Sequence, residues 1–133
     1  PPQKIRNIWG AAKIYDTRSG EVPLFPASLL DDPLLLKVAN AGQEYGVTTG
    51  RRRKVRWLDL DLLIHSINMT GTTNLVISKC DVLEEVGEFA LYIGEELETY
   101  GSMFEMQGRI SSLIASCCPL VKEVTYSYSP EKI

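Results

Sequence analysis

Residues 74–78 read Asn-Leu-Val-Ile-Ser (NLVIS), a short apolar run, and this run predicts a buried strand. On its amino-terminal side, apolar residues from Trp57 to about Met69 recur at helical spacing and predict a helix. On its carboxy-terminal side, the pattern predicts a strand at 88–93, a helix at 102–117 and a strand at 122–127. Strands therefore alternate with helices, which predicts an α/β fold with a mixed, mostly parallel sheet and flanking helices.

The first third of the chain extends this alternation. Residues 8–15 (IWGAAKIY) are apolar and predict a strand, and the Gly and Pro residues within 17–26 predict an irregular loop. Asp32-Pro33 resembles an N-cap followed by proline in the first helical turn, so we expect a helix from Leu34 to Tyr45 that ends at Gly46. In α/β folds, ligands gather at the loops that follow the carboxyl ends of strands.

Length and composition limit the class of protein. The 133 residues suffice for one domain, 1–133, and 44% apolar with 23% charged residues is typical of a folded globular chain. The net charge of −3 gives no reason to expect nucleic acid or an anionic membrane as a partner. No apolar stretch is long enough to span a bilayer, and the first residues lack a signal-peptide core. The chain also lacks an initiator methionine, so we expect a processed or truncated product.

Cysteine usage indicates the compartment. Cys80, Cys117 and Cys118 are odd in number and have no Cys-x-x-Cys spacing. This pattern argues against a disulfide framework and against a zinc site. A reducing cytosol fits it, so we expect a cytoplasmic protein.

A basic loop from Gly46 to Lys54 (GVTTGRRRK) has the composition of an anion clamp. Its two glycines permit unusual backbone angles, its hydroxyl and amide groups can bind an anion, and its guanidinium groups can fork onto carboxylate or phosphate. A solvated basic run or a localisation-type patch has the same composition. Residue types alone leave these interpretations open.

A second loop, Ser78 to Leu83 (SKCDVL), directly follows the strand at 74–78, at the start of the polar stretch 81–87. An aspartate such as Asp81 can accept two hydrogen bonds from the N1–H and N2 amine edge of guanine, whereas adenine has an acceptor at N1 and would be mispaired. A solvated turn is the competing interpretation of Lys-x-Asp taken alone.

Longer strings in the chain resemble the adenylosuccinate synthetase family. EYGVTTGRRRKVRWLD at 44–59 is similar, nearly residue for residue, to a family pattern of Thr-Thr-Gly-Arg, further basic positions and Trp-Leu/Phe-Asp. The loop at 78–83 resembles the family's Thr-Lys-Leu-Asp-Val-Leu-Asp. Residues 17–26 and 126–132 match in part a Thr-Arg-Val-Gly-x-Gly-Pro-Phe-Pro loop and a terminal Ile-Ser-Thr-Gly-Pro-Asp-Arg. Together these matches span most of the chain and imply the carboxy-terminal portion of a P-loop-like synthetase fold.

The resemblance implies a ligase that condenses IMP with L-aspartate at the expense of GTP, in a family whose members are usually homodimers. It gives aspartate-loop and IMP-binding roles to Val47, Thr48, Thr49, Gly50, Arg51, Arg52 and Arg53. Within this loop, Arg51 matches the arginine that also reaches the nucleotide monophosphate, and Arg53 matches the one that contacts the nucleoside triphosphate. The positions that correspond to GTP-binding residues are Arg53, Lys79, Cys80, Asp81, Ser127, Tyr128 and Ser129.

Three residues depart from the family pattern at or near these positions. Arg56 stands where the family usually has glycine before the tryptophan, which affects close packing there. Tyr128 and Ser129 replace Thr and Gly and add bulk beside the expected base. An ordinary chain terminus is the competing interpretation of this Ser/Tyr-rich segment.

The groups that make and break bonds have no match in this chain. The family's chemistry phosphorylates the 6-oxygen of IMP and then displaces the phosphate with aspartate, which needs a general acid and base and a glycine-rich phosphate loop. In the family these belong to an amino-terminal Gly-Asp-Glu-Gly-Lys-Gly region and a separate histidine. We assign no catalytic residue and no metal ligand here, we expect Mg²⁺ to be bound outside this chain, and we predict that the chain alone is inactive. His65 is predicted to lie on a helix flank.

Two alternatives stay open at this stage. One is a phage-type relative that acts on a 2-aminopurine deoxynucleotide and accepts ATP. The compact length between Glu96 and Met103 and the altered strip from Ser127 to Ser129 favour it. The other is a non-catalytic nucleotide-binding module that kept the scaffold without the amino-terminal half.

Overall fold

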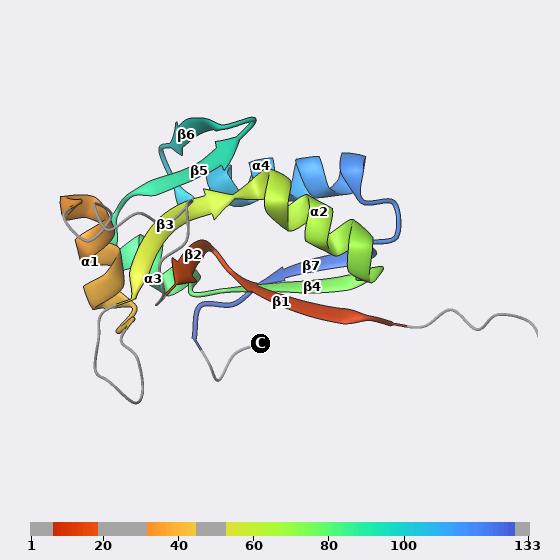
Figure 1. The fold of residues 1–133 in the computed structure, drawn as a ribbon, viewed down its shortest axis with the longest axis horizontal. Helices are drawn as coiled ribbons and strands as arrows, with labels where there is room; N and C mark the ends of the chain where they lie inside the picture. The colour runs from red at the N-terminus through yellow and green to blue at the C-terminus, as the bar shows by residue number, and fades with distance from the viewer. Residues whose placement is uncertain (1–6, 19–31, 45–52, 130–133) are drawn as a thin grey trace, which may run out of the picture.

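The computed structural model describes residues 7–18, 32–44 and 53–129 (Figure 1). Along the chain the strands and helices are β1 (Trp9–Lys13), β2 (Tyr15–Arg18), α1 (Pro33–Ala41), β3 (Lys54–Asp59), α2 (Leu60–Thr70), β4 (Asn74–Ser78), α3 (Cys80–Val86), β5 (Phe89–Ile93), β6 (Glu96–Tyr100), α4 (Met103–Cys117) and β7 (Glu123–Tyr126). The α/β alternation predicted from the sequence is confirmed.

The strands form two sheets that share one stretch of chain. In the first sheet the order is β1-β4-β7 and both pairings are parallel. In the second the order is β2-β3-β5-β6, with β3 and β5 parallel and the outer pairs antiparallel. Only Ile14 separates β1 from β2; it is fully buried, and its N–H donates to the Ser78 carbonyl at 2.9 Å. The chain thus passes from one sheet to the other beside the end of β4, as the red ribbon in Figure 1 shows.

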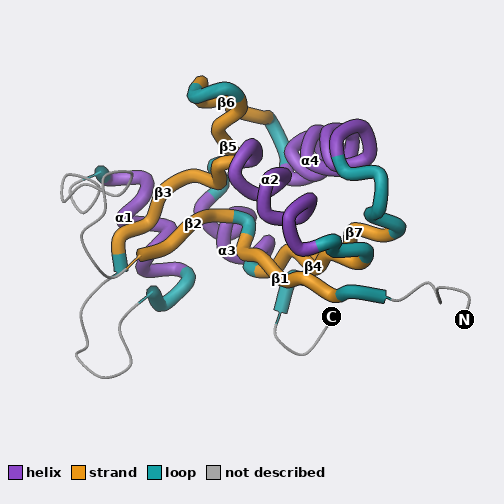
Figure 2. The backbone as a smooth tube through the Cα atoms, turned by 45° about the vertical axis from the view of Figure 1, so that its right-hand side comes forward, coloured by secondary structure: helices purple, strands orange, loops and turns teal. Residues whose placement is uncertain are grey.

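The two faces of the β1-β4-β7 sheet differ. In β4, Leu75 and Ile77 are buried in the core, whereas Val76 and Ser78, which point to the opposite face, are only partly buried. Figures 1 and 2 show α2 and α4 on the same side of this sheet. The other face carries no helix among the described residues, and the exposed Trp9 lies in β1 along it.

Helix caps agree with the sequence signals. Asp32 accepts hydrogen bonds from the Leu34 and Leu35 amides, as expected for the N-cap of α1. Ser102 caps α4 by accepting from the Glu105 amide at 3.1 Å. The predicted strand at 74–78 and the predicted helix at 102–117 are both confirmed, the helix beginning one residue later at Met103.

Several predicted boundaries were wrong. Trp57 belongs to strand β3, because it pairs with Tyr15 of β2 in the antiparallel register; Asp59 caps α2, which begins at Leu60. Helix α1 ends at Ala41, with Gly42 as its C-cap, and not at Gly46.

Secondary structure was also missed in polar segments. The stretch 81–87 lies mostly in the short helix α3, whose buried residues Cys80, Val82 and Leu83 pack into the core. The predicted loop from Thr17 begins inside strand β2. Strand β6 was not predicted; it returns from β5 through a two-residue turn at Gly94-Glu95.

Candidate functional site

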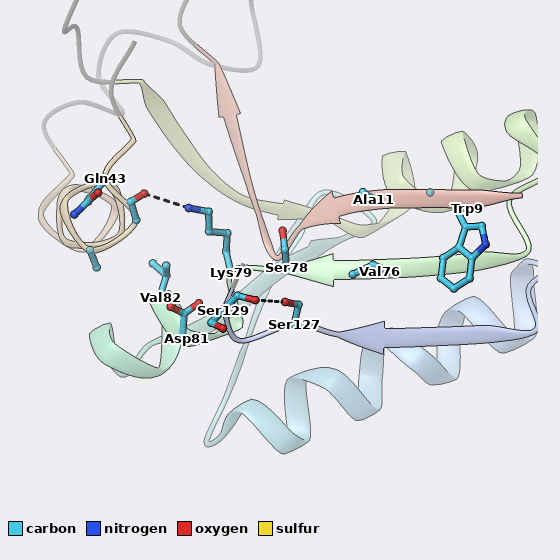
Figure 3. Close-up of a pocket in the computed structure, with 13 residues that line it drawn as sticks. Trp9, Ala11, Gln43, Val76, Ser78, Lys79, Asp81, Val82, Ser127 and Ser129 are labelled. Atoms are coloured by element: carbon cyan, nitrogen blue, oxygen red, sulfur yellow. Dashed lines mark hydrogen bonds between the residues drawn. The ribbon is translucent and has the colours of Figure 1, made fainter. Parts of the chain in front are cut away.

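A cavity of about 570 Å³ lies along the open face of the β1-β4-β7 sheet and reaches past the carboxyl end of β4 (Figure 3). Four segments that are distant in sequence surround it: β1, the end of α1, β4 with the turn that follows it, and the turn after β7. Its lining residues are Trp9, Gly10, Ala11, Ala41, Gly42, Gln43, Val76, Ser78, Lys79, Asp81, Val82, Ser127 and Ser129. Four of the sequence-predicted GTP-binding residues are therefore brought together in one place.

The turn from β4 into α3 forms one wall of this cavity. Lys79 occupies it in the left-handed region, at φ 68° and ψ 22°, a conformation that costs a non-glycine residue roughly 1–2 kcal/mol. The Lys79 ammonium donates to the Gly42 carbonyl at 3.4 Å, which ties the turn to the end of α1. Asp81 follows in the first turn of α3 with an exposed side chain. Its carboxylate can therefore act as a hydrogen-bond acceptor at the cavity wall.

The turn after β7 forms the neighbouring wall. The Ser127 amide donates to the Ile77 carbonyl at 2.8 Å, and the Cys80 amide donates to the Ser127 carbonyl at 3.1 Å, so the ends of β4 and β7 are held side by side. The Ser127 hydroxyl donates to the Ser129 carbonyl at 2.9 Å. The Ser129 hydroxyl is buried and has no hydrogen-bond partner among the residues described. A buried hydroxyl without a partner is uncommon in folded proteins, and this one reaches a ligand in the cavity only if its side chain rotates outward.

Three predicted GTP-binding residues, Cys80, Tyr128 and Arg53, do not line the cavity. The Cys80 side chain is fully buried, and its thiol contacts the Ile77 carbonyl at 3.7 Å. Burial raises the pKa of the Cys80 thiol to about 11, so the group stays protonated at neutral pH. Tyr128 does not line the cavity: its hydroxyl accepts a hydrogen bond from the Gln107 amide of α4 at 2.7 Å.

Of the predicted aspartate loop, only Arg53 belongs to the described part of the chain. Val47, Thr48, Thr49, Gly50, Arg51 and Arg52 lie outside the described residues. Arg53 is described and precedes β3. Its amide donates to the Glu44 carbonyl at 2.8 Å, and its Nη1 lies 3.5 Å from the Glu44 carboxylate. Arg53 therefore lies beside the chain that follows α1 and does not line the cavity.

Glu44 is the centre of a polar cluster that sequence reasoning missed. Its side chain is only 4% exposed, and it accepts hydrogen bonds from the Lys13 ammonium at 3.1 Å and from the Tyr15 hydroxyl at 2.5 Å. Burial of Tyr15 and its bond to Glu44 raise the pKa of the Tyr15 hydroxyl well above its usual range, so the phenol remains a donor. A Cβ on Gly42 would overlap this hydroxyl, which explains the glycine at the end of α1.

The apolar side of the cavity was also missed. Trp9, Ala11 and Val76 lie along it in Figure 3, on β1 and β4. Alternation within the predicted strands would have placed Trp9 and Ala11 on one face, but sequence gives no reason to choose that face as the open one. His65 is exposed on α2 and does not line the cavity, in agreement with its predicted helix-flank position.

A cage for a metal ion is not found in the described part of the chain, where no three His, Cys, Asp or Glu side chains cluster. Within the same residues, no helix has the length and apolar character needed to cross a membrane.

Comparison with known proteins identifies the family of this chain. The sequence model of the family described as "Adenylosuccinate synthetase" matches residues 1–126. The chain belongs to the adenylosuccinate synthetase family. Individual members show the same relationship over shorter spans. The chain is 43% identical over 105 residues to an adenylosuccinate synthetase of the yeast Meyerozyma guilliermondii, a match that covers 75% of this chain and 24% of that protein.

A bacterial member extends the match to nearly the whole chain. The adenylosuccinate synthetase of Thermodesulfovibrio yellowstonii is 38% identical over 123 residues, which covers 92% of this chain and 28% of that protein. The fold agrees with a solved structure, the fully ligated adenylosuccinate synthetase from Plasmodium falciparum, with a TM-score of 0.63 at 21% identity over 95% of this chain and 38% of that one. The chain thus spans about a quarter of the length of these curated relatives.

Proposed function

We propose that this chain is one domain of an adenylosuccinate synthetase, the ligase of purine nucleotide biosynthesis that condenses IMP with L-aspartate at the expense of GTP. The observation that carries the proposal is the cavity in which Lys79 and Asp81 meet Ser127 and Ser129, from segments more than forty residues apart in a chain of this family. The full protein is proposed to act in the cytoplasm as a homodimer, in keeping with the family resemblance.

The cavity is proposed to take the guanine base of GTP. The Asp81 carboxylate offers two acceptor oxygens, which suit the N1–H and N2 amine of guanine, and its exposed position lets a ligand reach it. The Ser129 hydroxyl is buried and has no partner among the described residues, and we propose that it rotates outward to supply a further donor or acceptor for a base edge. With adenine, the Asp81 carboxylate would face the lone pair on the adenine N1, and this pairing of two acceptors disfavours binding.

The aspartate substrate is proposed to bind the basic loop, through Val47, Thr48, Thr49, Gly50, Arg51, Arg52 and Arg53. Arg51 is proposed to reach the IMP phosphate as well, and Arg53 the triphosphate of GTP. Arginine suits both roles because its planar guanidinium can donate two parallel hydrogen bonds to a carboxylate or a phosphate.

We propose supporting roles outside the cavity for the two remaining predicted residues, Cys80 and Tyr128. The buried thiol of Cys80 supports the turn by packing, and its amide holds the Ser127 carbonyl. Tyr128 supports the turn after β7 because its hydroxyl accepts a hydrogen bond from the Gln107 side chain of α4. Bond-making groups and the ligands of Mg²⁺ are proposed to lie outside this chain; the ion would neutralise phosphate charge in the complete enzyme.

Nucleotide-dependent stability tests this proposal. We expect GDP and GTP to raise the melting temperature of the chain and ATP to have a much smaller effect. A ligand at ten times its Kd stabilises the folded state by about 1.4 kcal/mol, which corresponds to roughly 4 °C for a chain of this size. Trp9 fluorescence gives a second readout, because Trp9 lines the cavity and is 63% exposed, whereas Trp57 is buried.

The matched variants are Asp81→Asn and Glu84→Gln. Both remove one carboxylate charge from α3, but Glu84 is exposed and does not line the cavity. Asp81→Asn is expected to abolish the preference for guanine nucleotides, and Glu84→Gln to keep it. A larger shift with ATP than with GTP would refute the role of Asp81 and favour the ATP-using relative. A glycine-rich phosphate loop encoded in frame upstream of Pro1 would argue against a non-catalytic module.

A further inference from the structure

The Glu44 carboxylate is buried and yet lies among basic groups. It lies 3.1 Å from the Lys13 ammonium and 3.5 Å from the Arg53 guanidinium, and its second oxygen accepts from the Tyr15 hydroxyl. Burying a charge is costly unless it is paired and hydrogen-bonded, and here both oxygens have partners. Burial pushes the pKa of Glu44 upward, but the bonds from Tyr15 and Lys13 and the charges of Lys13 and Lys79 outweigh it and hold the pKa below its usual value.

Glu44 and Arg53 are tied together twice. The Arg53 amide donates to the Glu44 carbonyl at 2.8 Å, and the Arg53 side chain contacts the Glu44 carboxylate. The Glu44 amide in turn donates to the Ala39 carbonyl at 2.9 Å, which fixes Glu44 to the end of α1. Because a guanidinium has five N–H donors and this ion pair engages one terminal nitrogen, Arg53 retains donors for an anionic ligand.

The same cluster supports the rim of the cavity. Gly42 and Gln43 line the cavity and directly precede Glu44. The Gly42 carbonyl accepts from Lys79, while the Tyr15 hydroxyl that binds Glu44 occupies the space a side chain on Gly42 would need. The cluster around Glu44 therefore contacts both Arg53 and the Gly42 side of the cavity rim.

We propose that Glu44 is a positioning residue that orients Arg53 toward the triphosphate of the nucleotide held in the cavity. This inference rests on the proposed function, because it assigns the base to the cavity and the triphosphate to Arg53. Glu44 acts through Arg53 and touches no substrate. It makes the arginine a fixed donor at the start of β3, so that less side-chain freedom is lost when a phosphate binds.

The test compares GTP with GDP in a double-mutant cycle of Glu44→Gln and Arg53→Ala, followed by Trp9 fluorescence. In the wild-type chain GTP is expected to bind about tenfold more tightly than GDP, since only GTP carries the γ-phosphate. Each single substitution is expected to remove most of this difference, and the double substitution to remove no more, because both act on one contact. GDP affinity is expected to change by less than about threefold, and Glu84→Gln is the charge-matched control.

Other outcomes separate the two proposals. If the wild-type chain binds GTP and Glu44→Gln keeps the full preference over GDP, the positioning role is overturned. If the wild-type chain binds neither nucleotide, the proposed function fails, and urea unfolding of the same four proteins then tests the anchoring by itself. A coupling of about fivefold in the unfolding constant supports Glu44 as the anchor of Arg53, and independent effects of the two substitutions overturn it.

Discussion

Replacing Lys79 by alanine and by glycine separates the backbone role of this residue from its charge. Lys79 has φ 68° and ψ 22°, in the left-handed region that costs a non-glycine residue roughly 1–2 kcal/mol. Alanine keeps this cost, and glycine removes it. Glycine also gives the unfolded chain more freedom, which lowers stability by about 0.4–1 kcal/mol. Lys79→Gly is therefore expected to be more stable than Lys79→Ala by about 0.5–1 kcal/mol.

Urea unfolding followed by circular dichroism measures this difference from the two midpoints, provided that the slopes agree. Glu95 provides a matched control, because it is another non-glycine residue with positive φ, at 69°, but lies in the β5–β6 turn and does not line the cavity. Glu95→Gly is expected to exceed Glu95→Ala in stability by a similar amount and to leave nucleotide binding unchanged. Both Lys79 variants are expected to bind nucleotide more weakly, since both lose the ammonium.

At a regular helical position, glycine is expected to be less stable than alanine, which is the opposite of the order expected at Lys79. Ala115→Gly, at an exposed site within α4, is expected to lose about 1 kcal/mol. If Lys79→Gly were less stable than Lys79→Ala by a comparable amount, the left-handed conformation of Lys79 would not strain the turn from β4 to α3. The connection between backbone strain and a binding function at this turn would then be refuted.

Two further predictions follow from burial and charge. At pH 8 a thiol reagent is expected to label Cys117 rapidly and Cys80 and Cys118 slowly, because Cys117 is exposed and the other two are buried. Burial also raises the pKa of Cys80 to about 11. Cys117→Ser should remove the fast phase of labelling, and rapid labelling of two thiols in the wild-type chain would contradict this prediction. The pKa of Glu44 is lower in the folded state than its ordinary value of 4.5, so its stabilising contribution is present above that pH and is lost as the pH falls below it. Urea midpoints measured from pH 6 to pH 3 should therefore fall less steeply for Glu44→Gln than for the wild-type chain, and equal slopes would contradict the assignment.

Local sequence predicted those elements whose signal is self-contained. The strand at 74–78 was found with its bounds because a five-residue apolar run has the length of a strand, and α4 was found because Ser102 marks its start. Trp57 was assigned to a helix because its spacing to Leu60 fits a helical period. Its pairing with Tyr15 in β2 makes it a strand residue, and that partner lies 42 positions away. Non-local pairing decides such cases, and periodicity cannot detect it.

The candidate site also contains residues that local sequence could identify and residues that it could not. Lys79, Asp81, Ser127 and Ser129 could be named from the sequence because the short strings around them resemble the family pattern. The parallel pairing of β4 and β7 then brings the turns that carry them to one edge of the sheet. The Glu44 cluster could not, because Lys13 and Tyr15 lie about thirty residues from Glu44 and have no chemical signature of their own. Only the packing of β1 and β2 against the end of α1 brings a buried carboxylate and its donors together.

The departures from the family pattern have different consequences in the fold. Arg56, expected to disturb close packing, lies over the Tyr92 ring at 4.2 Å and pairs with Asp59 at 3.5 Å, so its side chain is accommodated beside β5. Tyr128 is turned toward Gln107 and adds no bulk to the cavity. Of these three residues, Ser129 alone lines the cavity, at the position where the family pattern has glycine, and its hydroxyl has no hydrogen-bond partner within the described part of the chain. We therefore propose Ser129→Gly as the variant that tests whether this side chain affects purine selection; an unchanged ratio of GTP affinity to ATP affinity would contradict such an effect.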